Sequence, residues 1–125
     1  MLNYNGHFPV PHPLPVKGNR YTSLFAALMH PLSRGSVHIS SADPLSPPII
    51  DPNYFGVETD LDILVSILKF TLKLYQTQPL SQIVKGRVLP DPESVDIEDE
   101  NALREYIKAT VSDEPSNSRI DVTTI

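Results

Sequence analysis

The stretch that decides the fold is His30-Pro31-Leu32-Ser33-Arg34-Gly35-Ser36-Val37-His38-Ile39, followed ten residues later by Ile50-Asp51-Pro52-Asn53-Tyr54-Phe55. Pro31 fixes its own φ, and Gly35 can adopt a positive φ, so the first part predicts a chain reversal. Val37 and Ile39 alternate with polar residues, which predicts a strand over residues 36–40. Asp51-Pro52-Asn53 predicts a second turn that leads into a helix.

Residues 59–78 form the clearest predicted helix. Thr59 is the expected N-cap, with Asp62 three residues later as a variant of the capping box. Apolar residues recur at helical spacing in two adjacent rows. The first row is Leu61, Leu64, Val65, Leu68, Leu72 and Tyr75, and the second is Ile63, Ile67, Phe70 and Leu74. Charged residues interrupt both rows too often for a membrane span.

A second helix is predicted over residues 99–111, with an inner face formed by Leu103, Tyr106, Ile107 and Thr110. Residues 91–100 precede it and hold six acidic residues and no basic one. A calcium site is one reading of this stretch, but the central glycine of an EF-hand loop is absent. A solvated acidic loop whose last carboxylates cap the helix is the simpler interpretation.

Composition limits the function classes. The 125 residues suit one domain, and the net charge of −5 argues against a nucleic-acid surface. There is no cysteine, so disulfides and thiolate metal sites are excluded. No signal peptide or transmembrane segment is recognisable, so localisation stays unknown. Of the 13 prolines, nine precede Phe55, which assigns extended structure to the first half and helices to the second.

The quoted stretches, together with Asp60, resemble the substrate-domain signature of the glucose–methanol–choline (GMC) oxidoreductases, in particular the aryl-alcohol oxidase and choline dehydrogenase branches. The resemblance covers roughly residues 5–111. It implies an α+β fold, a partial GMC substrate-binding domain in which antiparallel strands accompany the two main helices. It also implies that the short apolar segment 21–29, which periodicity alone leaves open between strand and helix, is a strand paired with residues 36–40.

The family resemblance also implies a chemistry. Full-length members use FAD and oxidise alcohols or sugars by hydride transfer to the flavin, assisted by a histidine base. The missing FAD-binding half is then the natural packing partner of this chain.

The chain lacks the residues that would carry this chemistry. In the family the second helix leads into His-Pro-x-Gly-Thr, whereas here no histidine follows His38. The five glycines contain no G-x-G-x-x-G for a pyrophosphate. We therefore assign no catalytic, FAD-binding or metal-ligating residue, and we expect the isolated fragment to be inactive and to bind no FAD.

The two ends of the chain are expected to lie outside the domain. Residues 1–20 predict a proline-rich extended arm, residues 21–112 the partial GMC domain, and residues 113–125 a polar, disordered tail. The abrupt change of composition after Ser112 favours a truncation or a broken gene.

Other candidate sites have simpler readings. His7 and His12 could share a metal, but no third ligand is near in the sequence. Arg34 could hold a ligand carboxylate, although an arginine that satisfies loop carbonyls is the more ordinary reading. Pro44-Leu45-Ser46-Pro47 fits P-x-x-P without a flanking basic pair. The alternative function is a small non-catalytic interaction domain with a proline-rich arm.

Overall fold

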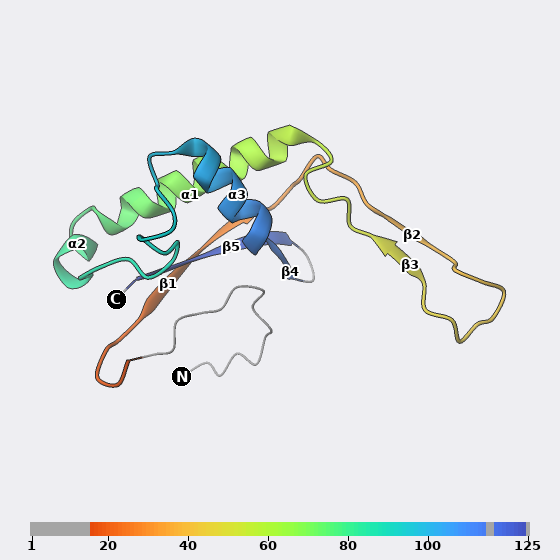
Figure 1. Cartoon of the computed structure of the whole chain (residues 1–125), viewed down its shortest axis with the longest axis horizontal. Coiled ribbons are helices and arrows are strands. Elements are labelled where there is room, and N and C mark those ends of the chain that lie inside the picture. The colour runs from red at the N-terminus through yellow and green to blue at the C-terminus, as the bar shows by residue number, and fades with distance from the viewer. Residues whose placement is uncertain (1–15, 115–116, 125) are drawn as a thin grey trace.

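The chain is a small α+β structure with a long arm. The computed structural model describes residues 16–114 and 117–124, with side chains over residues 16–111. Its elements, in chain order, are β1 (Thr22–Leu28), β2 (Ser36–His38), β3 (Ile49–Asp51), α1 (Glu58–Tyr75), α2 (Leu80–Ile83), α3 (Glu100–Thr110), β4 (Ser112–Glu114) and β5 (Asn117–Thr124). Figure 1 shows α1 running along the sheet, while β2 and β3 extend away from the body as an arm.

The strand predicted for residues 21–29 is confirmed as β1, but its predicted partner is wrong. β1 pairs antiparallel with β5, from Thr22 opposite Thr124 to Leu28 opposite Ser118. β2 pairs instead with β3, with Val37 opposite Ile50. The physical reason is that the segment after β1 is held at the start of α1, as described below, so β2 leaves the body and cannot return along β1.

The last strand also corrects the prediction of a disordered tail. Within residues 113–125, the described residues 113–114 and 117–124 lie in strands, and the sheet has the order β1-β5-β4. Alternation of apolar and polar residues in 120–124 is the pattern of a strand, and the edge of β1 supplies the unpaired backbone groups it needs. The polar composition of residues 113–119 concealed that pattern.

Both main helices are confirmed, but the predicted N-cap of the first is wrong. The N-cap of α1 is Val57, which makes no side-chain capping bond, and Thr59 lies inside the helix. A distant serine takes over the capping, as shown below. Asp99 is the N-cap of α3, and its carboxylate accepts the N–H of Asn101 at 2.9 Å, as the acidic stretch predicted.

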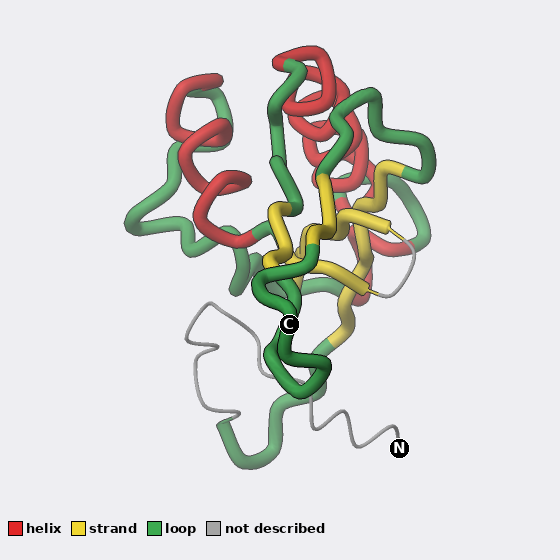
Figure 2. Tube along the Cα trace, turned by 90° about the vertical axis from the view of Figure 1, so that its right-hand side faces the viewer, coloured by secondary structure: helices red, strands yellow, loops and turns green. Residues whose placement is uncertain are grey.

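The core lies between α1, α3 and the sheet. Figure 2 shows the helices gathered on one side of the strands. All six residues of the first apolar row of α1 are buried, and Leu64 and Leu68 meet the buried Leu103 and Ile107 of α3. The second row is different: Ile63, Phe70 and Leu74 are exposed. One face of α1 is thus left without cover by the described residues.

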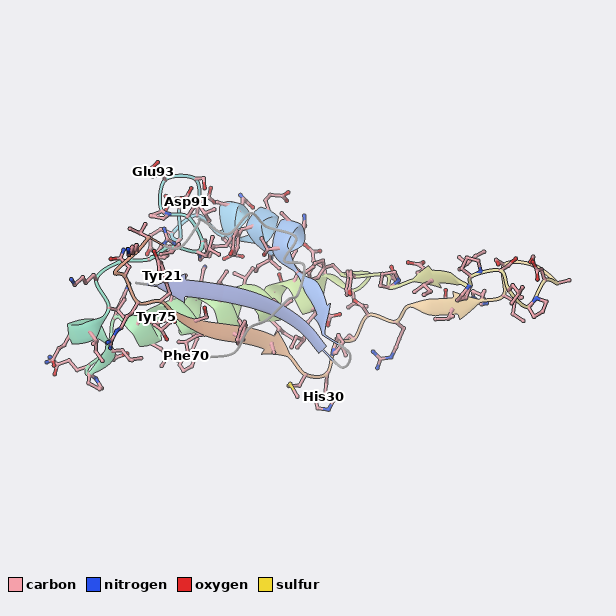
Figure 3. The ribbon with its side chains drawn as sticks, turned by 90° about the horizontal axis from the view of Figure 1, so that it is seen from below. Tyr21, His30, Phe70, Tyr75, Asp91 and Glu93 are labelled. Atoms are coloured by element: carbon pink, nitrogen blue, oxygen red, sulfur yellow. The ribbon has the colours of Figure 1, made fainter. Side chains whose placement is uncertain are left out.

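The arm formed by β2 and β3 also exposes apolar side chains. Its large exposed side chains are Val37, Ile39, Leu45, Ile49 and Ile50, and Leu45 is 91% exposed. Figure 3 shows the arm projecting far beyond the helices and the sheet. An isolated two-stranded ribbon is only marginally stable in water, so the arm depends on whatever fixes its base.

The structure describes only the end of the predicted proline-rich arm. Of the proline-rich arm 1–20, residues 1–15 lie outside the described residues, and residues 16–20 are exposed. Among the described residues, no helix has both the length and the apolar character needed to cross a bilayer.

Candidate functional site

Asp60, in the first turn of α1, holds the base of the arm. Its side chain is 2% exposed. One carboxylate oxygen, Oδ1, accepts the backbone N–H of Leu32 at 2.7 Å, and Oδ2 accepts the backbone N–H of Ser33 at 2.7 Å. Because these donors come from a segment 27 and 28 residues earlier, Asp60 ties the end of the β1 segment to the start of α1.

The side chain of Ser33 links Asp60 to the residue just before α1. Its hydroxyl donates to Asp60 Oδ2 at 2.5 Å, and its Oγ accepts the N–H of Val57 at 3.0 Å. Val57 is the N-cap residue whose own side chain offers no oxygen, so a serine 24 residues away satisfies a free N–H at the helix start. We call Leu32, Ser33, Val57 and Asp60 the Asp60 latch.

The electrostatics of the latch favour the ionised carboxylate. Burial raises the pKa of Asp60, but hydrogen bonds from Leu32 and Ser33 and the nearby Arg34 charge together bring that pKa below its usual value. The loop that covers Asp60 is thin, since Leu32 is itself 55% exposed. The carboxylate is therefore a fixed, charged anchor.

Asn53 and Gly35 close the other side of the arm's base. Asn53, at a φ of 46°, donates from Nδ2 to the carbonyl of Arg34 at 3.0 Å. A Cβ on Gly35 would lie 2.3 Å from the carbonyl oxygen of Asp51 and 2.8 Å from that of Pro52. Only glycine allows the two strands to start this close together.

Arg34 is a structural residue, as its simpler reading predicted. Its guanidinium donates to the carbonyl of Pro31 at 2.6 Å and to the carbonyl of Ser33 at 2.9 Å. These bonds stabilise the bend between β1 and β2, where the chain turns outward into the arm. The side chain is thereby engaged within its own loop.

The candidate metal sites gain no support. Within the described residues, no group of three or more His, Asp or Glu side chains could hold a metal ion. The carboxylates of Asp91 and Asp96 accept nearby backbone N–H groups, from Glu93 and Glu98, as expected of a solvated acidic loop. Accepting the N–H of Glu93 lowers the pKa of Asp91. His7 and His12 lie outside the described residues.

The described residues do not fit the pyrophosphate of FAD. Such a group needs glycines that leave room beside a helix N-terminus. At Gly35 and Gly56 that room is filled by atoms of the chain, with the Asn53 side chain 2.6 Å from a Cβ on Gly56. The starts of α1 and α3 carry the acidic residues Asp60 and Glu100, which repel a phosphate.

Most of the chain, including the base of the arm, matches a known protein family. A family model described as GMC oxidoreductase matches residues 31–117, well over half of the chain. The chain belongs to the GMC oxidoreductase family. The match begins at Pro31, so the whole Asp60 latch and both main helices of this GMC chain lie within it.

Curated relatives are similar over the same region. A GMC oxidoreductase family protein of Malassezia sympodialis is 41% identical over 83 residues, which are 66% of this chain and 13% of the relative. A glucose dehydrogenase [FAD, quinone] of Drosophila melanogaster is 45% identical over 64 residues, 51% of this chain and 10% of the relative. The versicolorin B synthase of Aspergillus parasiticus is 35% identical over 77 residues, 61% of this chain and 12% of the relative. This GMC chain thus spans about an eighth of their length, and no solved structure matches it.

The latch was not predicted from the sequence, although Asp60 was part of the quoted signature. A signal was available: Asp60 is a carboxylate directly beside the apolar row that begins at Leu61, where a charged residue needs partners. What the sequence did not supply was the position of Leu32 and Ser33. Their backbone donors have no residue-type signature.

We predict that Asp60→Asn lowers the free energy of unfolding by about 1–3 kcal/mol, because it removes the charge that two N–H groups and one hydroxyl share. Urea unfolding followed by circular dichroism measures this. Asp62→Asn is the matched control, since Asp62 is half exposed and pairs with Arg104 at the surface, where ion pairs contribute little. Equal effects of the two substitutions would contradict the latch.

The same variant has a predicted pH dependence. Because folding lowers the pKa of Asp60, its stabilisation is present above the unfolded pKa of about 3.9 and is lost as pH falls through the folded value. The difference between wild type and Asp60→Asn should therefore be largest above about pH 5 and should shrink below about pH 4.

Two glycine substitutions test the base of the arm. Gly35→Ala should destabilise the chain by about 1–3 kcal/mol, since the new Cβ meets two backbone carbonyls. Gly86→Ala is the control, because its Cβ meets nothing within 4 Å. Thermal unfolding compares the two, and a Gly35→Ala protein as stable as Gly86→Ala would refute this packing.

Proposed function

We propose that this chain is a segment of the substrate-binding domain of an FAD-dependent oxidoreductase that acts on CH–OH groups of donors. The full enzyme oxidises an alcohol or a sugar, and FAD, when bound there, accepts the hydride. The observation that carries the proposal is the family match over residues 31–117. The identity with a glucose dehydrogenase [FAD, quinone] supports this class of substrate.

In this proposal the segment is structural. The residues of its signature form the Asp60 latch and the base of the arm, and none of them is placed as a base or nucleophile. His30 and His38 are exposed, and a general base must be positioned against the reacting proton. The isolated chain therefore performs no hydride transfer and retains no FAD.

The FAD-binding part of a longer protein is the proposed packing partner. Exposed apolar surface on the arm, at Val37, Ile39 and Ile50, and on α1, at Phe70, supports this, because contiguous apolar surface is costly in water. The proposal also keeps the division between a proline-rich arm, residues 1–20, and the domain that begins at residue 21. The narrower resemblance to aryl-alcohol oxidase and choline dehydrogenase stays a prediction.

The alternative, a non-catalytic interaction domain with a proline-rich arm, has less support. Most of the proline-rich arm lies outside the described residues, and the P-x-x-P motif of residues 44–47 lies in the tip of the β2–β3 arm. There Ser46 donates its N–H to the carbonyl of Asp43 at 3.1 Å, which is a turn and not an extended polyproline helix.

A graft tests the proposed function. The matched 64-residue segment of this chain replaces its counterpart in the Drosophila melanogaster glucose dehydrogenase. We expect the chimera to retain FAD and to reduce it with glucose, because the segment supplies fold and not chemistry. The same chimera with Asp60→Asn should hold less FAD, since the arm loses its anchor.

The isolated 125-residue chain provides a second test of the proposal. It should purify colourless, with no absorbance near 450 nm. A chain that carries one flavin and reduces it with an alcohol would overturn the proposal, as would a well-folded chimera that binds no FAD.

A further inference from the structure

The arm formed by β2 and β3 is attached to the body at two points. Among the described helices and strands, β2 and β3 contact only each other. On the β2 side the attachment is the Asp60 latch, which fixes Leu32 and Ser33 to the start of α1. On the β3 side it is Phe55, which is partly buried and packs against the core. The direction of the whole arm, which Figure 1 shows extending away from the body, therefore depends on these two attachments.

The other contacts at the base hold the arm together without tying it to the body. Asn53 donates from Nδ2 to the carbonyl of Arg34 at 3.0 Å, which joins the segment after β3 to the segment before β2. Gly35 lies against the carbonyls of Asp51 and Pro52, again from one strand to the other. When the latch opens, these contacts remain, so the arm moves as one piece.

The core is held by forces that do not depend on charge. α1 and α3 meet through the buried side chains of Leu64, Leu68, Leu103 and Ile107. β1 and β5 are joined by an antiparallel backbone ladder. Apolar burial and backbone hydrogen bonds do not change with the protonation of a carboxylate. The core can therefore stay packed when the latch opens.

Asp60 is the one charged member of the latch. Arg34 acts on it through its charge, but the Arg34 guanidinium is bonded within its own loop. Glu58 and Asp62, which flank Asp60 in α1, both pair with Arg104 of α3. The other titratable groups on the segments that meet here are the exposed His30 and Asp51. Protonation of Asp60 thus removes a negative charge that no neighbouring acid replaces.

The direction of the pH effect follows from linkage. Burial raises the pKa of Asp60, but its hydrogen bonds and the Arg34 charge bring that pKa below its usual value while the latch is closed. In an open latch the carboxylate lies in water, with a pKa of about 3.9. The closed state binds the proton less well, so closure is favoured above about pH 4 and is lost as pH falls through the closed-state pKa.

We propose that the Asp60 latch is an acid-sensitive lock: when the carboxylate loses its charge, the arm pivots about its attachment at Phe55 while α1, α3 and the sheet stay packed. The lock sets the direction in which the arm presents its exposed apolar residues, Val37, Ile39 and Ile50. It is independent of the proposed redox function, because it uses contacts within the described residues and needs no flavin.

Distances between two spin labels test the lock. The chain has no cysteine, so labels attach only where cysteines are introduced. Leu45→Cys marks the tip of the arm, where the native side chain is 91% exposed, and Lys73→Cys marks an exposed position on α1. Ala109→Cys marks an exposed position on α3. Pulsed electron paramagnetic resonance then measures an arm distance, between positions 45 and 73, and a core distance, between positions 73 and 109.

At neutral pH we expect narrow distributions of both distances in the otherwise wild-type chain. At about pH 3 the arm distribution should become at least about twice as broad, while the core distribution stays narrow. Asp60→Asn should show the broad arm distribution already at neutral pH and should not change further with acid. Asp62→Asn is the matched control, and it should behave as the wild type at both pH values.

Two results would overturn the lock. One is an arm distribution that stays narrow in a folded Asp60→Asn chain, and the other is a core distribution that broadens together with the arm. If Asp60→Asn does not fold, Ser33→Ala decides together with the acid series of the wild type, because it removes the hydroxyl that links Asp60 to Val57. Narrow arm distributions in both would equally refute the proposal.

Discussion

The charged hydrogen bonds of Asp60 are the constraint on which the rest of the structure depends. They join the segment after β1 to the first turn of α1, two regions that the sequence separates by 27 residues. Once this junction is made, β1 lies along the buried row of α1, and its outer edge is free to pair with β5. The same junction turns the chain outward, so that β2 and β3 pair with each other as an arm.

This constraint gives a structural role to several residues in the stretch that matches the family. Asp60 provides the acceptor, Ser33 the relay to the helix start, Asn53 the bond to the Arg34 carbonyl, and Gly35 the space for two backbone carbonyls. Each of these contacts holds the fold together at the base of the arm.

The sequence predicted those features that local patterns determine. Two apolar rows predicted both helices and the core between them, because helical spacing is visible within a few turns. The rows contain Leu64 and Leu68 in the first helix and Leu103 and Ile107 in the second. Strand pairing is not local, so the partner of β1 was predicted wrongly. β3 was missed since its three residues lie between Pro48 and Pro52, where a strand is not expected. In the candidate site, Arg34 was interpreted correctly from its loop, whereas the role of Asp60 required the position of Ser33.

Hydrogen exchange at the amides of Leu32 and Ser33 tests the central claim most directly. Both residues belong to no helix or strand of the structure, so the Asp60 carboxylate is their specific source of protection. If the latch holds, both amides should exchange at least about a hundredfold more slowly than in an unstructured peptide at neutral pH. The two should also share one opening free energy with the first turn of α1. Exchange of both amides at the unprotected rate, with the α1 amides still protected, would show that Asp60 does not fix the arm to the helix.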